Sequence, residues 1–196
     1  MGHTEGAVSA SERPLRADAR RNRQRLLEVA VEAFSTPGRD VSLEAIAKAA
    51  GVGIGTLYRH FPTREALVEA AYRNEVARLC DIVPELLESA PPDIAMRSWM
   101  DRFVDYVTAK RGMLDTLRAI VASGGDPFTE TKARMHGAVG EFLAAGAEAG
   151  TLRSDVLPED VLAALSGVTL ASGGPDQRAQ AGRLLDLIMD GLRARG

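Results

Sequence analysis

Residues 41–61 read VSLEAIAKAAGVGIGTLYRHF, and this stretch decides how the chain is interpreted. Apolar residues at helical spacing predict a short helix over residues 42–50, with Ser42 as its N-cap. Gly51-Val52-Gly53 breaks the chain, and a second short helix is predicted over residues 54–61. Two short helices joined by a tight glycine turn are typical of a helix-turn-helix motif, whose second helix can enter the major groove of DNA.

The second helix of this motif has two chemically different faces. Its inward face would be apolar, because Leu57 and Phe61 lie four residues apart. Its outward residues would be small or hydrogen-bonding, as reading of base edges requires: Gly55, Thr56, Tyr58, Arg59 and His60. Gly53 and Gly55 would let the backbone approach a phosphate closely, where amides at a helix N-terminus favour an anion. The alternative is that Tyr58 and His60 are ordinary surface residues of a helical bundle.

Charge is distributed unevenly along the 196 residues. The formal net charge is -3, yet residues 13–62 hold nine basic and five acidic residues, whereas residues 63–196 hold 15 basic and 20 acidic residues. A basic segment on an acidic body indicates that one end of the molecule meets a polyanion. The alternative is that these basic residues form an ordinary solvated helix face, which would have the same composition.

Helical periodicity continues on both sides of the motif, and no alternating strand pattern interrupts it. We expect a helix from about Arg20 to Phe34 before the motif and a long helix capped by Thr63 after it. Prolines and glycines divide the rest into helices: Pro84, Pro91-Pro92, Gly112, Gly124-Gly125, Gly150 and Pro158. The prediction is an all-α fold of about nine helices. It comprises a flexible tail (residues 1–16), a three-helix DNA-binding domain (17–62) and a helical-bundle domain (63–196).

The predicted bundle carries aromatic and methionine side chains at helical spacing. Such residues usually form core, but they can also surround a largely apolar small molecule, since methionine adapts to varied shapes. The candidate pocket residues are Trp99, Phe103, Tyr106, Met113, Leu117, Met135 and Phe142. His136 could orient a polar group of such a ligand.

The last two predicted helices hold more apolar residues than one edge of a bundle needs. Two such helices from each of two subunits would form a four-helix contact. The candidate residues of this dimer interface are Leu162, Leu165, Leu184, Leu187 and Ile188. The alternative is that these side chains are buried within one monomer.

Several other classes of protein find little support in the sequence. Cys80 is the single cysteine, which excludes an internal disulfide and a cysteine-rich zinc site. The three histidines are scattered, and no phosphate-binding loop or catalytic motif is recognisable, so we expect no metal, no cofactor and no enzymatic activity. The N-terminal stretch lacks the apolar run of a signal peptide, and no run of about 18 apolar residues occurs. We therefore expect a cytoplasmic protein that does not bind membranes.

The run AIAKAAGVGIGTLYRHFPTREALVEA, residues 45–70, resembles the signature of TetR-family transcriptional regulators of the TetR/AcrR type. The shared features are small apolar residues before the turn, Gly-Val, Gly-Thr-Leu-Tyr-x-His-Phe, and a capping residue followed by a basic residue and Glu. The resemblance is specific over about residues 20–80, and farther on only general features agree, such as GTLRSDV at residues 150–156. Ile54 departs from the pattern, because family members often have a polar residue there. An isoleucine could instead touch a thymine methyl group.

The resemblance implies a homodimeric, sequence-specific DNA-binding regulator, most simply a repressor that a small effector molecule releases from its double-stranded operator. It implies base contacts by Gly55 and Thr56, phosphate contacts by Ser42, Tyr58, His60 and Arg64, and a contact of either kind by Arg59. Arg16 or Arg20 would extend into the adjacent minor groove. Two alternatives stay open: a DNA-binding protein that responds to no ligand, and a helical enzyme.

Overall fold

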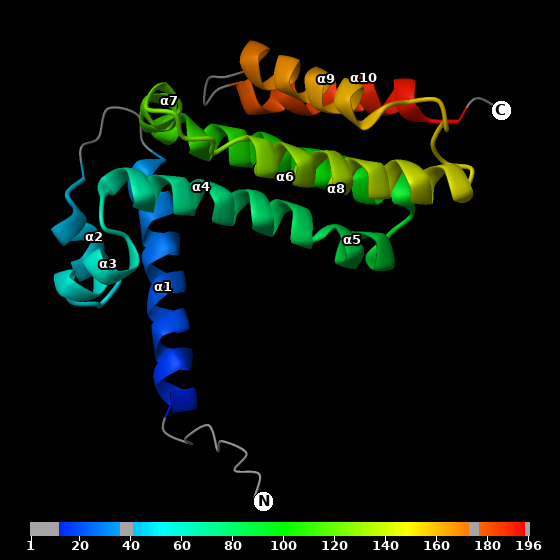
Figure 1. Cartoon of the computed structure of the whole chain (residues 1–196). Coiled ribbons are helices and arrows are strands. Elements are labelled where there is room, and N and C mark those ends of the chain that lie inside the picture. The colour runs from blue at the N-terminus through cyan, green and yellow to red at the C-terminus, as the bar shows by residue number, and fades with distance from the viewer. Residues whose placement is uncertain (1–11, 36–40, 173–176, 195–196) are drawn as a thin grey trace, which may run out of the picture.

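The computed structural model of the chain describes residues 12–35, 41–172 and 177–194, and this part of the chain is built from helices (Figure 1). It contains ten α-helices and one 3-10 helix. Within these ranges no strand forms, although one isolated bridge joins Leu152 to Arg193. The predicted all-α class is confirmed.

The N-terminal end is formed by α1 (Glu12–Phe34), α2 (Leu43–Ala49), α3 (Ile54–His60) and the start of α4 (Arg64–Asp81). These helices share one core, because the apolar stripe of each helix faces the others. Its buried members include Leu26, Leu27, Phe34, Ile46, Leu57, Phe61 and Leu67. The helix-turn-helix motif is thus held on α1 and α4, which the figure shows crossing beside it (Figure 1).

The ends of these helices follow the predicted capping residues. The Ser42 hydroxyl accepts a hydrogen bond from the amide of Ala45 at 3.2 Å, and the Thr63 hydroxyl accepts one from the amide of Ala66 at 3.1 Å. Each bond satisfies an amide that has no partner within its helix. After α2 the chain turns at Gly51, whose φ of 67° lies in the left-handed region that glycine adopts without strain.

The start of α1 differs from the prediction. The helix begins at Glu12 rather than near Arg20, so residues 12–16 of the predicted tail are helical. Pro14 is compatible with this start, because amides in the first turn have no partner within the helix. The helix ends at Phe34, as the sequence predicts, and residues 36–40, which include the predicted break Thr36-Pro37-Gly38, lie outside the described part of the chain.

The remaining helices form three layers together with α4. They are α5 (Val83–Ser89), α6 (Pro92–Lys110), the 3-10 helix η1 (Arg111–Met113), α7 (Leu114–Ala122), α8 (Thr129–Glu148), α9 (Pro158–Ala171) and α10 (Arg178–Leu192). In Figure 1, α6 and α8 lie between α4–α5 on one side and α9–α10 on the other. The helices outnumber the predicted nine because α4 ends at Asp81 and Pro84 lies in the first turn of a separate helix, α5.

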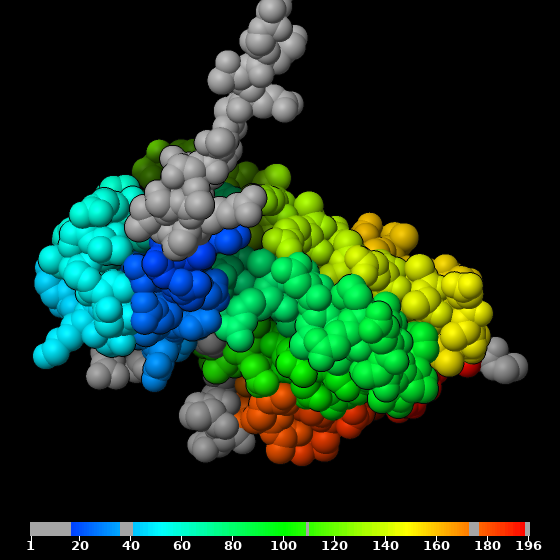
Figure 2. All heavy atoms as spheres, turned by 90° about the horizontal axis from the view of Figure 1, so that it is seen from below, coloured from blue at the N-terminus to red at the C-terminus, as the bar shows by residue number. Residues whose placement is uncertain are grey.

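The N-terminal helices adjoin the bundle at one end, as the space-filling view from below shows (Figure 2). There the 3-10 helix η1 packs against the end of α1. A Cβ atom on Gly112 would lie 1.8 Å from the carbonyl oxygen of Phe34. Glycine is therefore required at position 112, since any side chain would force α1 and η1 apart. None of the helices in the described ranges has the length and hydropathy needed to cross a membrane.

Candidate functional site

The exposed face of α3 is narrow and largely polar. Leu57 and Phe61 are buried, whereas the Tyr58 side chain is 45% exposed and Gly55 and Arg59 are exposed as well. Thr56 and His60 are half-buried, and Ile54 is exposed at the start of the helix. Leu57 and Phe61 thus face inward as the sequence predicts, whereas two of the five residues predicted to face outward, Thr56 and His60, are only partly exposed.

No backbone conformation or contact in the described part of the chain requires glycine at position 53 or 55. The backbone of Gly53 has φ -69° and ψ 147°, a conformation that any residue adopts. A Cβ atom at either position would meet no other atom within 4 Å. What the two glycines provide is a bare backbone surface at the start of α3, which another molecule can approach closely.

Arg64, which the family resemblance predicts to bind a phosphate, makes contacts within the chain. Its guanidinium donates a hydrogen bond to the carbonyl oxygen of Val41 at 2.5 Å, and its central carbon lies 4.8 Å from the centre of the Phe34 ring. The side chain thereby joins the start of α4 to the end of α1 and the start of α2. Sequence patterns do not predict this role, because both partners, Val41 and Phe34, lie more than 20 residues before Arg64 along the chain.

The basic residues of α1 divide into packing and exposed positions. Arg23 stacks over the ring of Phe61 at 5.5 Å and so helps to hold α1 against α3. Arg20 is exposed and belongs to the N-terminal half of α1. This half of the helix projects away from the bundle (Figure 1). The side chain of Arg16 lies outside the described residues.

A cavity of about 560 Å³ lies among α4, α6, α8 and α9. Three of the predicted pocket residues, Phe103, Tyr106 and Met135, line this cavity, as does His136. The other four, Trp99, Met113, Leu117 and Phe142, are buried in the core and do not line it. The Trp99 indole, for example, donates a hydrogen bond to the carbonyl of Leu79 at 2.8 Å.

Most polar residues of the cavity wall are not among those that the sequence predicts to line it. The additional lining residues include Tyr72 of α4, Lys110 at the end of α6, Phe128 and Thr131 at the start of α8, and Leu162 and Leu170 of α9. The hydroxyl groups of Tyr72 and Thr131 lie 2.9 Å apart. Burial lowers the pKa of Lys110, and burial together with the nearby Tyr72 raises the pKa of Tyr106. The cavity therefore combines apolar surface with a few polar groups.

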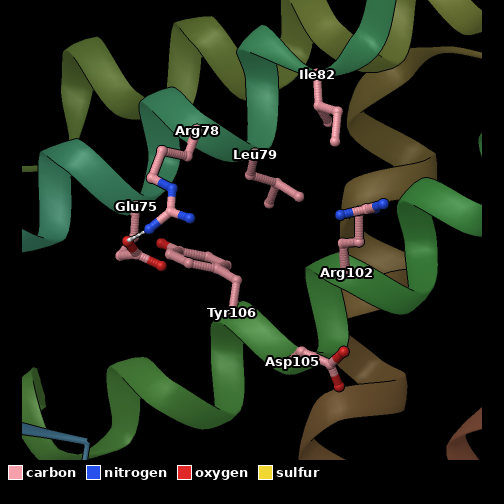
Figure 3. A pocket seen from close by; sticks show the side chains of 7 residues that line it. All are labelled: Glu75, Arg78, Leu79, Ile82, Arg102, Asp105 and Tyr106. Carbon is pink, nitrogen blue, oxygen red and sulfur yellow. Dashed lines mark hydrogen bonds and ion pairs between the residues drawn. The ribbon is translucent and has the colours of Figure 1, made fainter. Parts of the chain in front are cut away.

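A second hollow, of about 400 Å³, lies on the other side of Tyr106 between α4 and α6 (Figure 3). Its lining is charged with both signs, from Glu75, Arg78, Arg102 and Asp105, and Arg78 lies 3.4 Å from Glu75. The hydroxyl end of Tyr106 points towards Glu75 in this view. Charges that pair with one another favour a solvated groove over a site for an apolar ligand.

The predicted dimer residues are not equally accessible. Leu187 is 66% exposed, Leu162, Leu184 and Ile188 are half-buried, and Leu165 is fully buried within the chain. On the neighbouring helix α9, Leu170 is 86% exposed. The accessible apolar surface of α9 and α10 is thus centred on Leu170 and Leu187, and Leu165 serves the core.

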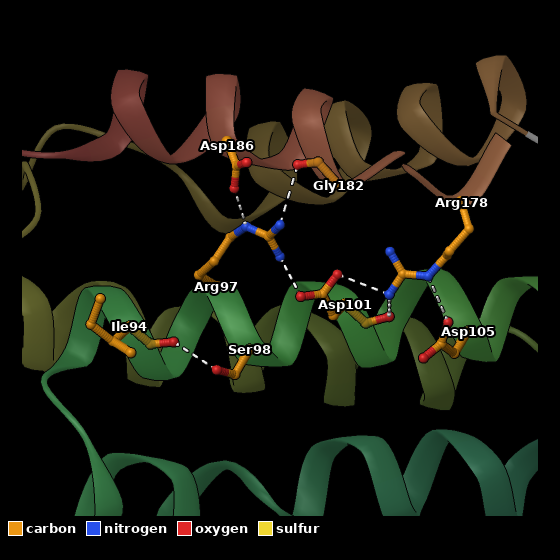
Figure 4. Close-up of polar contacts among 8 residues, drawn as sticks. All are labelled: Ile94, Arg97, Ser98, Asp101, Asp105, Arg178, Gly182 and Asp186. Carbon is orange, nitrogen blue, oxygen red and sulfur yellow. Dashed lines mark hydrogen bonds and ion pairs between the residues drawn. The ribbon is translucent and has the colours of Figure 1, made fainter. Parts of the chain in front are cut away.

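Ion pairs fix the orientation of α10 on α6 (Figure 4). Arg97 of α6 lies 2.7 Å from Asp186 of α10, and Arg178 of α10 lies 2.9 Å from Asp101 and 3.1 Å from Asp105 of α6. Arg97 also donates to the carbonyl of Gly182 at 3.2 Å. Because these contacts hold one face of α10 against α6, Leu187 is kept on the opposite, outward side.

Two family models match the chain. The model of bacterial regulatory proteins of the tetR family matches residues 26–71, and the model of the C-terminal domain of SbtR-like transcriptional regulators matches residues 91–194. An HTH-type transcriptional regulator of Staphylococcus aureus (strain USA300) is 46% identical over 54 residues. That match covers 27% of this chain and 29% of the relative, so the chain spans less than a third of the length of such curated relatives.

Solved structures match over nearly the whole chain. A TetR transcriptional regulator from Streptomyces coelicolor is 58% identical, with a TM-score of 0.82, and the match covers 89% of this chain and 99% of that one. A TetR transcription regulatory protein from Mycobacterium vanbaalenii is 38% identical, with a TM-score of 0.73 and coverage of 92% and 100%. With the helix-turn-helix in place between α1 and α4, these likenesses establish that the chain belongs to the TetR family of DNA-binding transcriptional regulators.

Proposed function

We propose that the chain is a homodimeric repressor that a small molecule, bound in the cavity among α4, α6, α8 and α9, releases from operator DNA. One observation carries this proposal: α4 reaches both sites. It begins at Arg64, directly after α3, and it contributes Tyr72 to the cavity wall. A molecule in the cavity would therefore touch the helix that supports the DNA-binding motif. Because its target would be chromosomal DNA, we place the protein in the cytoplasm.

The proposed DNA contacts are centred on α3. Gly55 and Thr56 would lie nearest the base edges, and Gly53 would let a phosphate approach the backbone. Tyr58, His60 and Ser42 would hydrogen-bond phosphates, Arg59 would reach a base or a phosphate, Arg64 would add a phosphate contact, and Arg20 would enter the minor groove. The exposure of α3 and the bare backbone at its start support this assignment. We divide the chain functionally between residues 62 and 63.

The proposed dimer forms through α9 and α10 of each subunit. Leu170 and Leu187 would leave water on association, with Leu184 and Ile188 beside them. The two α3 helices of the dimer would then enter successive major grooves, roughly 34–36 Å apart, on a near-palindromic operator. A ligand that favours another orientation of α4 would change this spacing. Linkage requires that DNA and ligand weaken each other's binding by the same factor, with a typical coupling free energy of about 1–3 kcal/mol.

A mobility-shift assay on DNA that flanks the protein's own gene, at two salt concentrations and followed by footprinting, tests DNA recognition. We expect a protected site with two symmetric halves. Arg59→Ala should weaken binding to this site, whereas Lys48→Ala, which removes an exposed charge from α2, should bind like the wild type. Failure of every duplex to bind, or protection of a single half-site, would contradict the proposal. A bound complex that no small molecule releases would favour a ligand-independent DNA-binding protein.

A further inference from the structure

Lys110 places a half-buried positive charge in the wall of the cavity. Its Nζ atom lies 5.0 Å from the ring centre of Tyr72, 5.4 Å from that of Phe128 and 5.8 Å from that of Tyr106. Three aromatic faces from α4, α6 and the start of α8 thus surround one ammonium group. Cation–π attraction offsets part of the cost of its burial.

No carboxylate in the described part of the chain forms an ion pair with this ammonium group. Glu75 is near, since it lines a small void together with Lys110, but it is paired with Arg78 at 3.4 Å. Glu159 lines the cavity from α9 and is exposed to solvent. By contrast, arginines that join the bundle helices are paired with carboxylates, as Arg97 and Arg178 are. Lys110 therefore differs from its neighbours in having aromatic partners alone.

An ammonium group in such a place is stabilised by any anion that reaches it. Burial of an unpaired charge is unfavourable, and the environment lowers the pKa of Lys110 accordingly. A bound anion would add a charge-assisted hydrogen bond in a site partly shielded from water. The missing anion would have to come from a ligand, since the lining residues do not supply it.

We propose that the cavity binds an amphipathic monocarboxylic acid, with its carboxylate on Lys110 and its apolar body along Phe103, Met135 and Leu162. This inference rests on the proposed function and names the chemical class of its effector. The volume of about 560 Å³ fits a ligand of ordinary small-molecule size. Lys110 is half-buried, whereas the other lysine of the wall, Lys132, is exposed and Glu159 adds a negative charge, so the site suits one negative charge better than the two of a phosphate group.

The position of Lys110 also links this ligand to DNA binding. Lys110 is followed directly by η1, where Gly112 packs against Phe34 at the end of α1 and Arg111 donates to the carbonyl of Thr169 at 3.1 Å. A carboxylate that draws the ammonium group away from the Tyr72 ring would alter the contact between α4 and the end of α6. Both α4 and η1 adjoin the DNA-binding helices, so the disturbance would reach the motif from two sides.

The test compares matched acids and amides on the full-length protein without DNA. The probes are decanoate with decanamide and 4-phenylbutyrate with 4-phenylbutyramide, and binding is followed by calorimetry and by the fluorescence of Trp99, the single tryptophan, which lies 5.8 Å from Phe103. We expect at least one acid to bind the wild type about tenfold more tightly than its amide, because the amide lacks the charge-assisted contact. Equal binding of acid and amide, or no binding by either acid, would overturn the inference.

Two lysine variants test whether Lys110 causes the preference for the acid over the amide. Lys110→Met keeps the length and apolar character of the side chain, and it should reduce the ratio of acid to amide affinity to about one. Lys132→Met removes an exposed lysine from the same wall and should preserve the wild-type ratio. Persistence of the preference in folded Lys110→Met would overturn the assignment of the carboxylate to Lys110.

Mobility-shift assays with the same probes separate this inference from the proposed function. If the acids bind through Lys110 but leave the DNA complex intact, the proposal that a bound molecule releases the DNA is refuted. The proposal that the cavity binds a monocarboxylic acid would then still hold. Release of DNA by decanamide and 4-phenylbutyramide as effectively as by the acids would refute the ligand class and preserve the proposed function.

Discussion

Gly55 provides a residue-scale test in which stability and DNA binding should change in opposite directions. A Cβ atom there meets nothing within 4 Å, and glycine within a helix is less favourable than alanine by roughly 0.5–1 kcal/mol. Gly55→Ala should therefore keep or slightly raise the free energy of unfolding, measured by urea denaturation. It should weaken operator binding, because the added methyl group stands between α3 and the DNA.

Gly137→Ala is the matched control for this substitution. Gly137 is exposed on α8, far from α3, and its Cβ atom would also meet nothing within 4 Å. The control should gain similar stability and bind the operator like the wild type. Unchanged operator affinity in Gly55→Ala would remove Gly55 from the surface that meets DNA.

Arg64 should contribute to both folding and DNA binding. Arg64→Ala leaves the carbonyl of Val41 without this donor and the Phe34 ring without its cation, so the free energy of unfolding should fall by about 1–3 kcal/mol. If the side chain also pairs with a phosphate, the plot of log affinity against log salt concentration should flatten by about one unit of slope. Loss of stability with an unchanged slope would confine Arg64 to joining α1, α2 and α4.

At the scale of elements, the contact between η1 and α1 is one of close backbone approach between the DNA-binding helices and the bundle. Gly112→Ala would place a methyl group 1.8 Å from the carbonyl oxygen of Phe34, so the two elements must separate. Overpacking of this kind costs about 1–3 kcal/mol, which thermal denaturation should detect. Operator affinity should change too, since α1 supports α3. Gly137→Ala, on the exposed side of α8 and outside the proposed dimer interface, should leave operator affinity unchanged, and equal behaviour of the two variants would contradict this role of Gly112.

The elements that local chemistry specifies were predictable from the sequence. Ser42, Gly51 and Thr63 act through bonds and backbone angles within a few residues, and each helix boundary they predict is confirmed. The cavity depends instead on which helices become neighbours. Tyr72 lies outside the aromatic pattern of α6 and α8, and Lys110 has the charge of a surface residue, so periodicity alone gave no reason to place them together.

At the scale of the whole molecule, the DNA-binding unit should be a dimer joined through α9 and α10. Leu187→Glu introduces a charge at a residue 66% exposed in the free chain, so the monomer should fold normally, whereas the dimer would have to bury that carboxylate. Sedimentation should then show monomers, and tight operator binding should be lost because each half-site is held by one subunit. Val121→Glu, at a 46% exposed position on α7, changes the net charge equally and should remain dimeric. A persisting dimer in Leu187→Glu would place the interface on another surface, and monomers that keep full operator affinity would show that pairing of the subunits is not what positions the two α3 helices.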